Sequence, residues 1–262
     1  MTTKPELVEY TSHLLGRTTK VRENHGHISI PGYMGGSSFP NKFYAPFDSE
    51  MILNAIVNKF GVKASDVAAM WKLNNEASTG YGKAIHAALE NYDKNRELGH
   101  KIRNSKETKK DGVVFSPNKA LSKNAFLTAI VEWFQEVAGD DSAILTEEFI
   151  WDDLEKTCGS VDRIKIVDMD KKIIRIQDYK TDGNIHDKKY QLKDSPFKAT
   201  MGNELLDLHW LQLSFYARIF LRAGWMVEGL DIFWLNPEKL VKGKNPWEVF
   251  SSEVIDITEG MK

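Results

Sequence analysis

Two runs of alternating residues, separated by a short polar segment, constrain the fold of this chain most. Apolar and polar side chains alternate from Val161 to Val167 and again from Ile173 to Lys180, which is typical of half-buried β-strands. Residues 168–172 between them read Asp-Met-Asp-Lys-Lys and predict a turn. We therefore expect a β-hairpin in which Ile164 stands opposite Ile176, with both side chains on one apolar face.

The same register predicts that Asp162 stands opposite Asp178 at the edge of that face, with the Cβ atoms about 5 Å apart. Like charges in this position destabilise a sheet, whereas a hard divalent cation binds carboxylate oxygens and reverses the effect. Lys180 lies one step further along the same face. One interpretation is a metal site. The other is a pair of aspartates turned into solvent, with Lys180 as a surface counter-charge; the Asp…Asp-x-Lys order favours the metal site.

The segments Gly159–Ile164 (GSVDRI) and Asp178–Thr181 (DYKT) resemble the motif of the PD-(D/E)xK nuclease superfamily. The resemblance is narrower to its RecB-like exonuclease branch, which includes mitochondrial and phage nucleases. Val161 replaces the proline that names the motif, and the aspartate after it is intact. The resemblance implies that Asp162, Asp178 and Lys180 are catalytic.

Other signatures of this branch follow in the expected order. Trp71, a small-residue turn at Ala77-Ser78, and Gly82 precede His86, which by resemblance is a metal ligand on a helix ahead of the hairpin. The branch often has a glutamate on the strand that enters the hairpin. Glu147 and Glu148 both qualify, and alternation exposes only one of them to the site without saying which.

A helix expected over about 204–222 is apolar on most sides and carries Gln212 and Tyr216 at i, i+4. A buried glutamine needs hydrogen-bond partners, so these two residues are also compatible with a purely structural role. The branch, however, has a Gln-x-x-x-Tyr signature at this place. By resemblance the DNA-contacting residues are Gln212, Tyr216, Arg163, Thr181 and Ser78, and the metal ligands are His86, Asp162, Asp178 and the Tyr179 carbonyl.

The resemblance implies an α/β fold with a restriction-endonuclease-like core, in which helices flank a central mixed β-sheet. We expect one domain over 1–262, with a helical or irregular N-terminal addition over 1–75 and the nuclease core over 76–262. The addition includes a short helix over 5–16 and helices over 49–60 and 64–74. Residues 93–122 are charged and locally basic and predict an inserted loop.

The composition agrees with an ordinary globular chain of 42% hydrophobic residues and mean hydropathy −0.40. A net charge of −2 means that any grip on DNA comes from local patches. Cys158 is the single cysteine, which rules out an intramolecular disulfide and the four-cysteine iron–sulfur cluster of some relatives. No apolar run approaches the length of a membrane helix, so we expect a cytoplasmic protein.

The resulting hypothesis is a DNA exonuclease that hydrolyses phosphodiester bonds with one or two Mg²⁺ or Mn²⁺ ions. Three alternatives remain open at this point. The first is a structure-selective endonuclease or junction resolvase with the same chemistry. The second is a non-catalytic DNA-binding module, and the third is a metal-free α/β protein with surface carboxylates on its hairpin.

Overall fold

A computed structural model describes residues 7–24, 27–46, 48–104, 124–139, 143–187, 191–193 and 195–262, with the backbone alone at 24, 27 and 95–104. Its centre is a mixed six-stranded sheet of order β4-β6-β7-β8-β9, with β5 paired to β6. The strands are β4 (Met34–Gly35), β5 (Ala143–Asp152), β6 (Thr157–Asp168), β7 (Ile173–Lys180), β8 (Met226–Leu235) and β9 (Trp247–Ser252). The expected α/β fold with a mixed sheet and flanking helices is thus confirmed.

The predicted hairpin is β6–β7, and its register is the expected one from Arg163 to Ile166, after which a bulge shifts the pairing so that Asp168 stands opposite Ile173. Ile164 pairs with Ile176 and Ile166 with Ile174. The turn is fixed by the Asp168 carboxylate, which accepts a hydrogen bond of 2.9 Å from the backbone N–H of Lys171. Lys172 has φ of 55°, a left-handed conformation that lets the chain return into β7.

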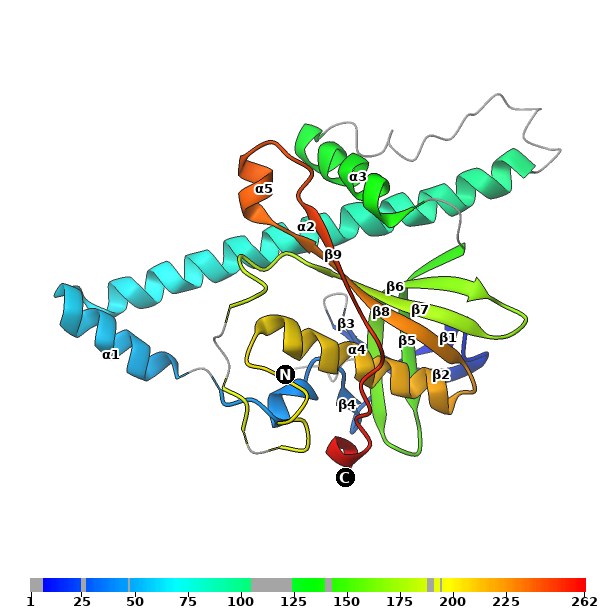
Figure 1. Cartoon of the computed structure of the whole chain (residues 1–262), viewed down its shortest axis with the longest axis horizontal. Helices are drawn as coiled ribbons and strands as arrows, with labels where there is room; N and C mark the ends of the chain where they lie inside the picture. Colours follow the sequence, from blue (N-terminus) through cyan, green and yellow to red (C-terminus); the bar gives the residue numbers. More distant parts are fainter. Residues whose placement is uncertain are drawn as a thin grey trace.

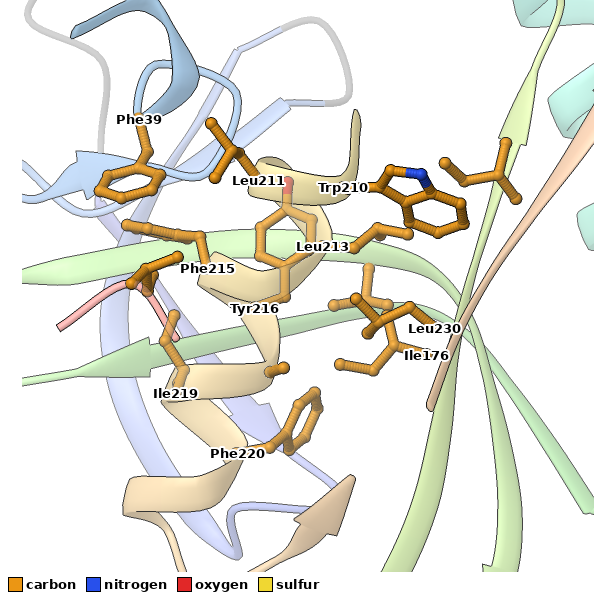
Figure 2. Packing of buried hydrophobic residues seen from close by; sticks show 14 of the residues in the cluster. Phe39, Ile176, Trp210, Leu211, Leu213, Phe215, Tyr216, Ile219, Phe220 and Leu230 are labelled. Atoms are coloured by element: carbon orange, nitrogen blue, oxygen red, sulfur yellow. The ribbon is translucent and has the colours of Figure 1, made fainter. Parts of the chain in front are cut away.

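Helices cover both faces of the sheet. On one face α4 (Leu205–Arg222) packs against the hairpin, and Figure 2 shows its aromatic and aliphatic side chains beside Ile176 and Leu230. The start of α4 is fixed by reciprocal hydrogen bonds of Glu204 and Asp207. On the other face, α2 (Ala64–Asn104) and α3 (Ala125–Ala138) enclose a second core with Phe134 at its centre.

The N-terminal region differs from the expected helix over 5–16. The structure has a separate three-stranded antiparallel sheet of β1 (Leu7–Ser12), β2 (Arg17–Asn24) and β3 (His27–Ser29). The turn between β1 and β2 is anchored on β5, because the buried Glu148 carboxylate accepts hydrogen bonds from Ser12 and Leu14. A tertiary contact thus decides the local structure here.

Helix α1 (Ser49–Phe60) matches its prediction, with Asp48 as N-cap and Gly61 at φ of 65° after its end. The helix expected over 64–74 and the expected helix that carries His86 are not separate elements. They form one 41-residue helix, α2, which runs along the length of the molecule in Figure 1 with α1 at one end. This helix crosses the expected boundary at 75/76 and continues through 93–104. The rest of the expected loop, residues 105–122, lies outside the described residues.

The segment between β4 and α1 also belongs to the main core. Phe39 and Phe43 are buried against α4, and the Phe39 and Phe215 rings lie 5.2 Å apart. A short 3₁₀ helix, Pro40–Lys42, connects Phe39 to Phe43. Two further short helices lie among the described residues, α5 (Pro237–Val241) and a 3₁₀ turn at Glu259–Met261. Among the described residues, no helix combines the length and apolarity needed to cross a membrane.

Candidate functional site

The two aspartates of the hairpin lie where β6 and β7 separate. The β6–β7 ladder ends at the Arg163–Gln177 pair. Asp162 and Asp178 are the next residues beyond this pair, on the side away from the turn. Their side chains contact each other, and the Asp162 Oδ2 atom also accepts a hydrogen bond of 3.3 Å from the Tyr179 N–H. The side chains of Asp162 and Asp178 are only 18% and 5% exposed. The alternative in which they turn into solvent is therefore wrong.

Lys180 points back to the same acids. Its ammonium nitrogen lies 2.5 Å from Asp178 Oδ2, and its side chain is 15% exposed. Burial lowers the pKa of Lys180, but the negative charges of Asp178 and Asp162 outweigh it, so that the pKa lies above its ordinary value. Lys180 is thus a charged group held inside the site rather than a surface counter-charge.

His86 reaches the site from α2. Its Nδ1 atom lies 3.3 Å from Asp162 Oδ2, and its ring meets the Tyr179 ring edge-on at 5.6 Å. One turn earlier, Gly82 lets the helix approach the end of β7, since a Cβ at Gly82 would lie 3.0 Å from Thr181 Oγ1. The Gly-x-x-x-His spacing therefore has a geometric reason: glycine gives the close crossing, and the histidine on the same face meets the carboxylate.

The structure distinguishes the two candidate glutamates. Glu148 is buried beneath the β1–β2 turn and has no part in the site. Glu147 lines the cavity described below, as does Asp162, and it lies on β5 between Thr146 and Glu148, which pair with Arg163 and Val161 on either side of Asp162. Its φ of 53° is unusual for a residue with a side chain, and such outliers concentrate at functional sites. Burial, together with the negative charge of Glu90, raises the pKa of Glu147 to about 7.

Helix α4 contributes Gln212 and Tyr216. The Gln212 Nε2 atom donates a 3.1 Å hydrogen bond to the Tyr216 hydroxyl, and both side chains line the cavity. In Figure 2 the Tyr216 ring projects from the middle of α4. The helix therefore presents an amide and a phenol toward the space above the carboxylates, as the i, i+4 spacing predicts.

These residues surround one cavity of about 760 Å³. Four elements enclose it: α2, α4, the β5–β6 pair, and the N-terminal segment that contains β3 and β4. The lining residues that belong to the predicted site are Gly82, His86, Glu147, Asp162, Gln212 and Tyr216. The other lining residues are Ile28, Ser29, Tyr33, Gly35, Gly36, Ser37, Lys83, Ala87, Glu90, Cys158, Gly159 and Ser160.

Arg163 does not lie in this cavity, and its assignment as a DNA contact is corrected. Arg163 is 1% exposed because alternation turns it to the opposite face of β6 from Asp162. Its guanidinium group donates a 2.8 Å hydrogen bond to Asp93 of α2 and another to Gln177 of β7. Tyr179 also donates to Asp93, over 3.2 Å. Arg163 therefore joins the helix to the sheet beneath the site.

The small-residue turn expected at Ala77-Ser78 is wrong, because both residues belong to the continuous helix α2. Ser78 is exposed on this helix and does not line the cavity, and its role as a DNA contact stays a prediction. A pair that sequence reasoning missed lies on the other side of Lys180: His209 Nε2 and Asp182 Oδ2 are 3.2 Å apart. The one feature of the sequence that points to this pair is that His209 precedes Gln212 by three residues and so lies on the same face of the helix.

The two aspartates differ in their electrostatics. Burial raises the pKa of Asp162 well above its ordinary value, and the negative charge of Asp178 raises it further. Burial also raises the pKa of Asp178, but Lys180 and the hydrogen bond from Asp162 lower it by more, so that it lies below its ordinary value. The pKa shifts of the two carboxyl groups therefore run in opposite directions, as expected for close acids of which one is paired with a positive charge.

The donor set fits a hard or borderline divalent cation. Carboxylate oxygens suit Mg²⁺ and Mn²⁺, and an imidazole nitrogen suits Mn²⁺. Asp178 Oδ2 is buried and receives no hydrogen bond of good geometry, although Lys180 is close. Among the described residues, however, no group of three or more His, Cys, Asp or Glu side chains is already arranged to enclose an ion.

Comparison with known proteins does not identify a family for this chain. No protein-family model matches the chain, and no curated protein matches it either.

Proposed function

We propose that this chain is a Mg²⁺- or Mn²⁺-dependent deoxyribonuclease that removes nucleotides from DNA ends. The observation that carries the proposal is the convergence of His86, Asp162, Asp178 and Lys180, which come from one helix and two strands and meet within hydrogen-bonding distances. Two buried acids, an imidazole and a paired ammonium group beside a large cavity form a site suited to hydrolysing a phosphodiester.

Asp162, Asp178 and His86 would hold the ion, and the Tyr179 carbonyl is a further oxygen donor beside them. When bound, Mg²⁺ or Mn²⁺ polarises the phosphoryl oxygen and makes water a stronger nucleophile. Glu147 lines the same cavity as Asp162 and adds a third carboxyl group to the site.

Lys180 supplies the positive charge that such a reaction needs. Its raised pKa keeps the ammonium group protonated at neutral pH, so that it acts as a fixed donor and not as a base. It would orient the attacking water and offset the negative charge that develops on the phosphate. A charge that is already in position costs no reorganisation when the reaction occurs.

Digestion of end-labelled DNA tests the proposal. Linear and circular single strands, and linear and nicked duplexes, are incubated with Mg²⁺, with Mn²⁺ or with EDTA. We expect metal-dependent loss of nucleotides from linear DNA and no cleavage of the circle, because an exonuclease needs an end. Cleavage of circular DNA would instead favour the endonuclease alternative, and DNA binding without any cleavage would favour the non-catalytic module.

A further inference from the structure

The N-terminal segment Met34–Ser37 lies beside the candidate site, although the sequence analysis placed it outside the nuclease core. It runs parallel to the start of β6, where Met34 pairs with Thr157 and Gly35 with Cys158. The Gly36 N–H donates a 3.1 Å hydrogen bond to the Cys158 carbonyl. The segment thus occupies the edge of β6 next to the point where β7 has separated from it, and Gly35, Gly36 and Ser37 line the cavity.

The Tyr216 ring packs against two glycines, Gly36 of this segment and Gly159 of β6. A Cβ at Gly36 would lie 2.6 Å from Cζ and 2.8 Å from Oη of Tyr216. A Cβ at Gly159 of β6 would overlap the same ring, with Cζ at 3.2 Å. Neither glycine has a positive φ, so the nearby ring is the reason that a side chain is not accommodated. At neighbouring Gly35, by contrast, a Cβ would meet no atom within 4 Å.

The position of Tyr216 matters because its hydroxyl accepts the hydrogen bond from Gln212, and both groups face the cavity that contains Asp162. Burial raises the pKa of Tyr216, which keeps the phenol neutral. Ser37, Lys83 and Ser160 also line this cavity. Hydroxyl and ammonium donors of this kind bind phosphate oxygens, and an aromatic ring provides a surface for a base.

We propose that Gly36 and Gly159 are positioning residues that hold Tyr216 and Gln212 in place, and that Met34–Ser37 forms one wall of the substrate site. Through Tyr216, this wall sets how a phosphate-bearing strand lies over the carboxylates. The identity of the strand as DNA rests on the function proposed above, whereas the fit of the ring between the two glycines is independent of it.

The test compares Gly36→Ala and Gly159→Ala with Gly183→Ala. Gly183 is exposed and lies outside the cavity, and a Cβ added there would meet no atom within 4 Å. Binding of a fluorescein-labelled single-stranded oligodeoxythymidylate is measured by anisotropy in EDTA, and cleavage is measured with Mn²⁺. We expect binding to weaken roughly tenfold in both cavity variants, equivalent to one lost aromatic contact. KM should rise more than kcat falls, and Gly183→Ala should match the wild type.

A double variant, Gly36→Ala with Tyr216→Leu, separates positioning from folding. The smaller side chain relieves the overlap, so we expect the melting temperature to recover while oligonucleotide binding stays weak. If Gly36→Ala does not fold, Tyr216→Phe removes the hydroxyl that accepts from Gln212 and should itself weaken binding.

Two failures are distinguishable. If the wild-type protein binds and cleaves DNA and both cavity variants behave like Gly183→Ala, the inference is wrong while the proposed function stands. The inference is also wrong if the double variant regains binding together with stability. If the wild type neither binds nor cleaves any DNA, the proposed function is wrong, and the substrate role of the wall is wrong with it.

Discussion

At the residue scale, Lys180 is the group whose role is most specific. Its ammonium group is buried against Asp178 and stays charged, so replacing it removes charge stabilisation without removing a carboxylate. We predict that Lys180→Ala lowers kcat roughly a hundredfold or more and leaves Mn²⁺ affinity within a few-fold of the wild type. Cleavage assays and isothermal titration measure the two quantities. Lys171→Ala, at the exposed hairpin turn, is the matched control, and near-wild-type cleavage by Lys180→Ala would exclude the role.

The consecutive glutamates Glu147 and Glu148 give a second prediction, because they face different environments. Glu147→Gln removes a carboxyl group from the cavity and should reduce cleavage while leaving thermal stability unchanged or slightly higher, since the carboxylate is buried near like charges. Glu148→Gln replaces one acceptor oxygen by a donor amide beneath Ser12 and Leu14. It should lower the free energy of unfolding by about 1–3 kcal/mol. Urea unfolding and cleavage assays on both variants check this, and equal effects on stability would contradict it.

The sequence predicts the facing aspartates, Lys180 and the Gln212–Tyr216 pair because each follows from a strict period of two or of 3.6 residues. The same alternation turns Arg163 to the face of β6 opposite Asp162. Arg163 was nevertheless expected to contact DNA, because it lies next to Asp162 in the motif. Glu147 could not be chosen over Glu148, because the choice depends on a left-handed backbone conformation and on an N-terminal sheet that reaches Glu148 from far along the chain.

At the scale of elements, β7 and β8 are joined by a charged cluster on the sheet. Arg175 donates two hydrogen bonds, of 2.6 and 2.8 Å, to Asp231, and Gln177 and Ser251 donate one each. Burial raises the pKa of Asp231, but these donors lower it by more, so that it lies below the ordinary value of 3.8. The carboxylate therefore stabilises the parallel pairing of the two strands at neutral pH.

A pH-dependent loss of stability follows from this cluster. Because the folded-state pKa of Asp231 is depressed, its contribution is complete above the ordinary pKa and disappears as the pH falls through the lower folded-state value. We predict that Asp231→Asn lowers the free energy of unfolding by about 2 kcal/mol at pH 7. The difference from the wild type should shrink only below about pH 4. Urea titrations from pH 7 to pH 3 measure it, and a difference that does not change with pH would contradict the assignment.

The elements themselves were predicted unevenly. The hairpin, α1 and α4 have strong local signals: alternation, an Asp48 N-cap with Gly61 after the helix, and an apolar run with a capping box. The division of α2 was wrong because the small residues Ala77 and Ser78 resemble a turn in the sequence, whereas the helix continues through them. The pairing of β1 with β2 was missed, and a helix was expected over 5–16, because the anchor of this pair, Glu148, lies on a distant strand.

At the scale of the whole molecule, a divalent cation that binds only the folded site must stabilise the entire chain. Free Mn²⁺ at 100 times its Kd is expected to raise the free energy of unfolding by about 2.7 kcal/mol. The melting temperature should therefore rise with Mn²⁺ for the wild type. It should not rise for Asp162→Asn or His86→Ala, whereas Asp168→Asn at the hairpin turn should respond like the wild type. Identical shifts of the melting temperature in the wild type and all three variants would mean that the ion binds elsewhere.

The central claim is that one ion is shared by groups from α2, β6 and β7. Anomalous diffraction from a crystal soaked in Mn²⁺ tests it most directly. The account predicts a strong anomalous peak in contact with Asp162, Asp178 and His86, which disappears in crystals of Asp178→Asn. A fully soaked wild-type crystal with no peak among these three side chains would contradict it.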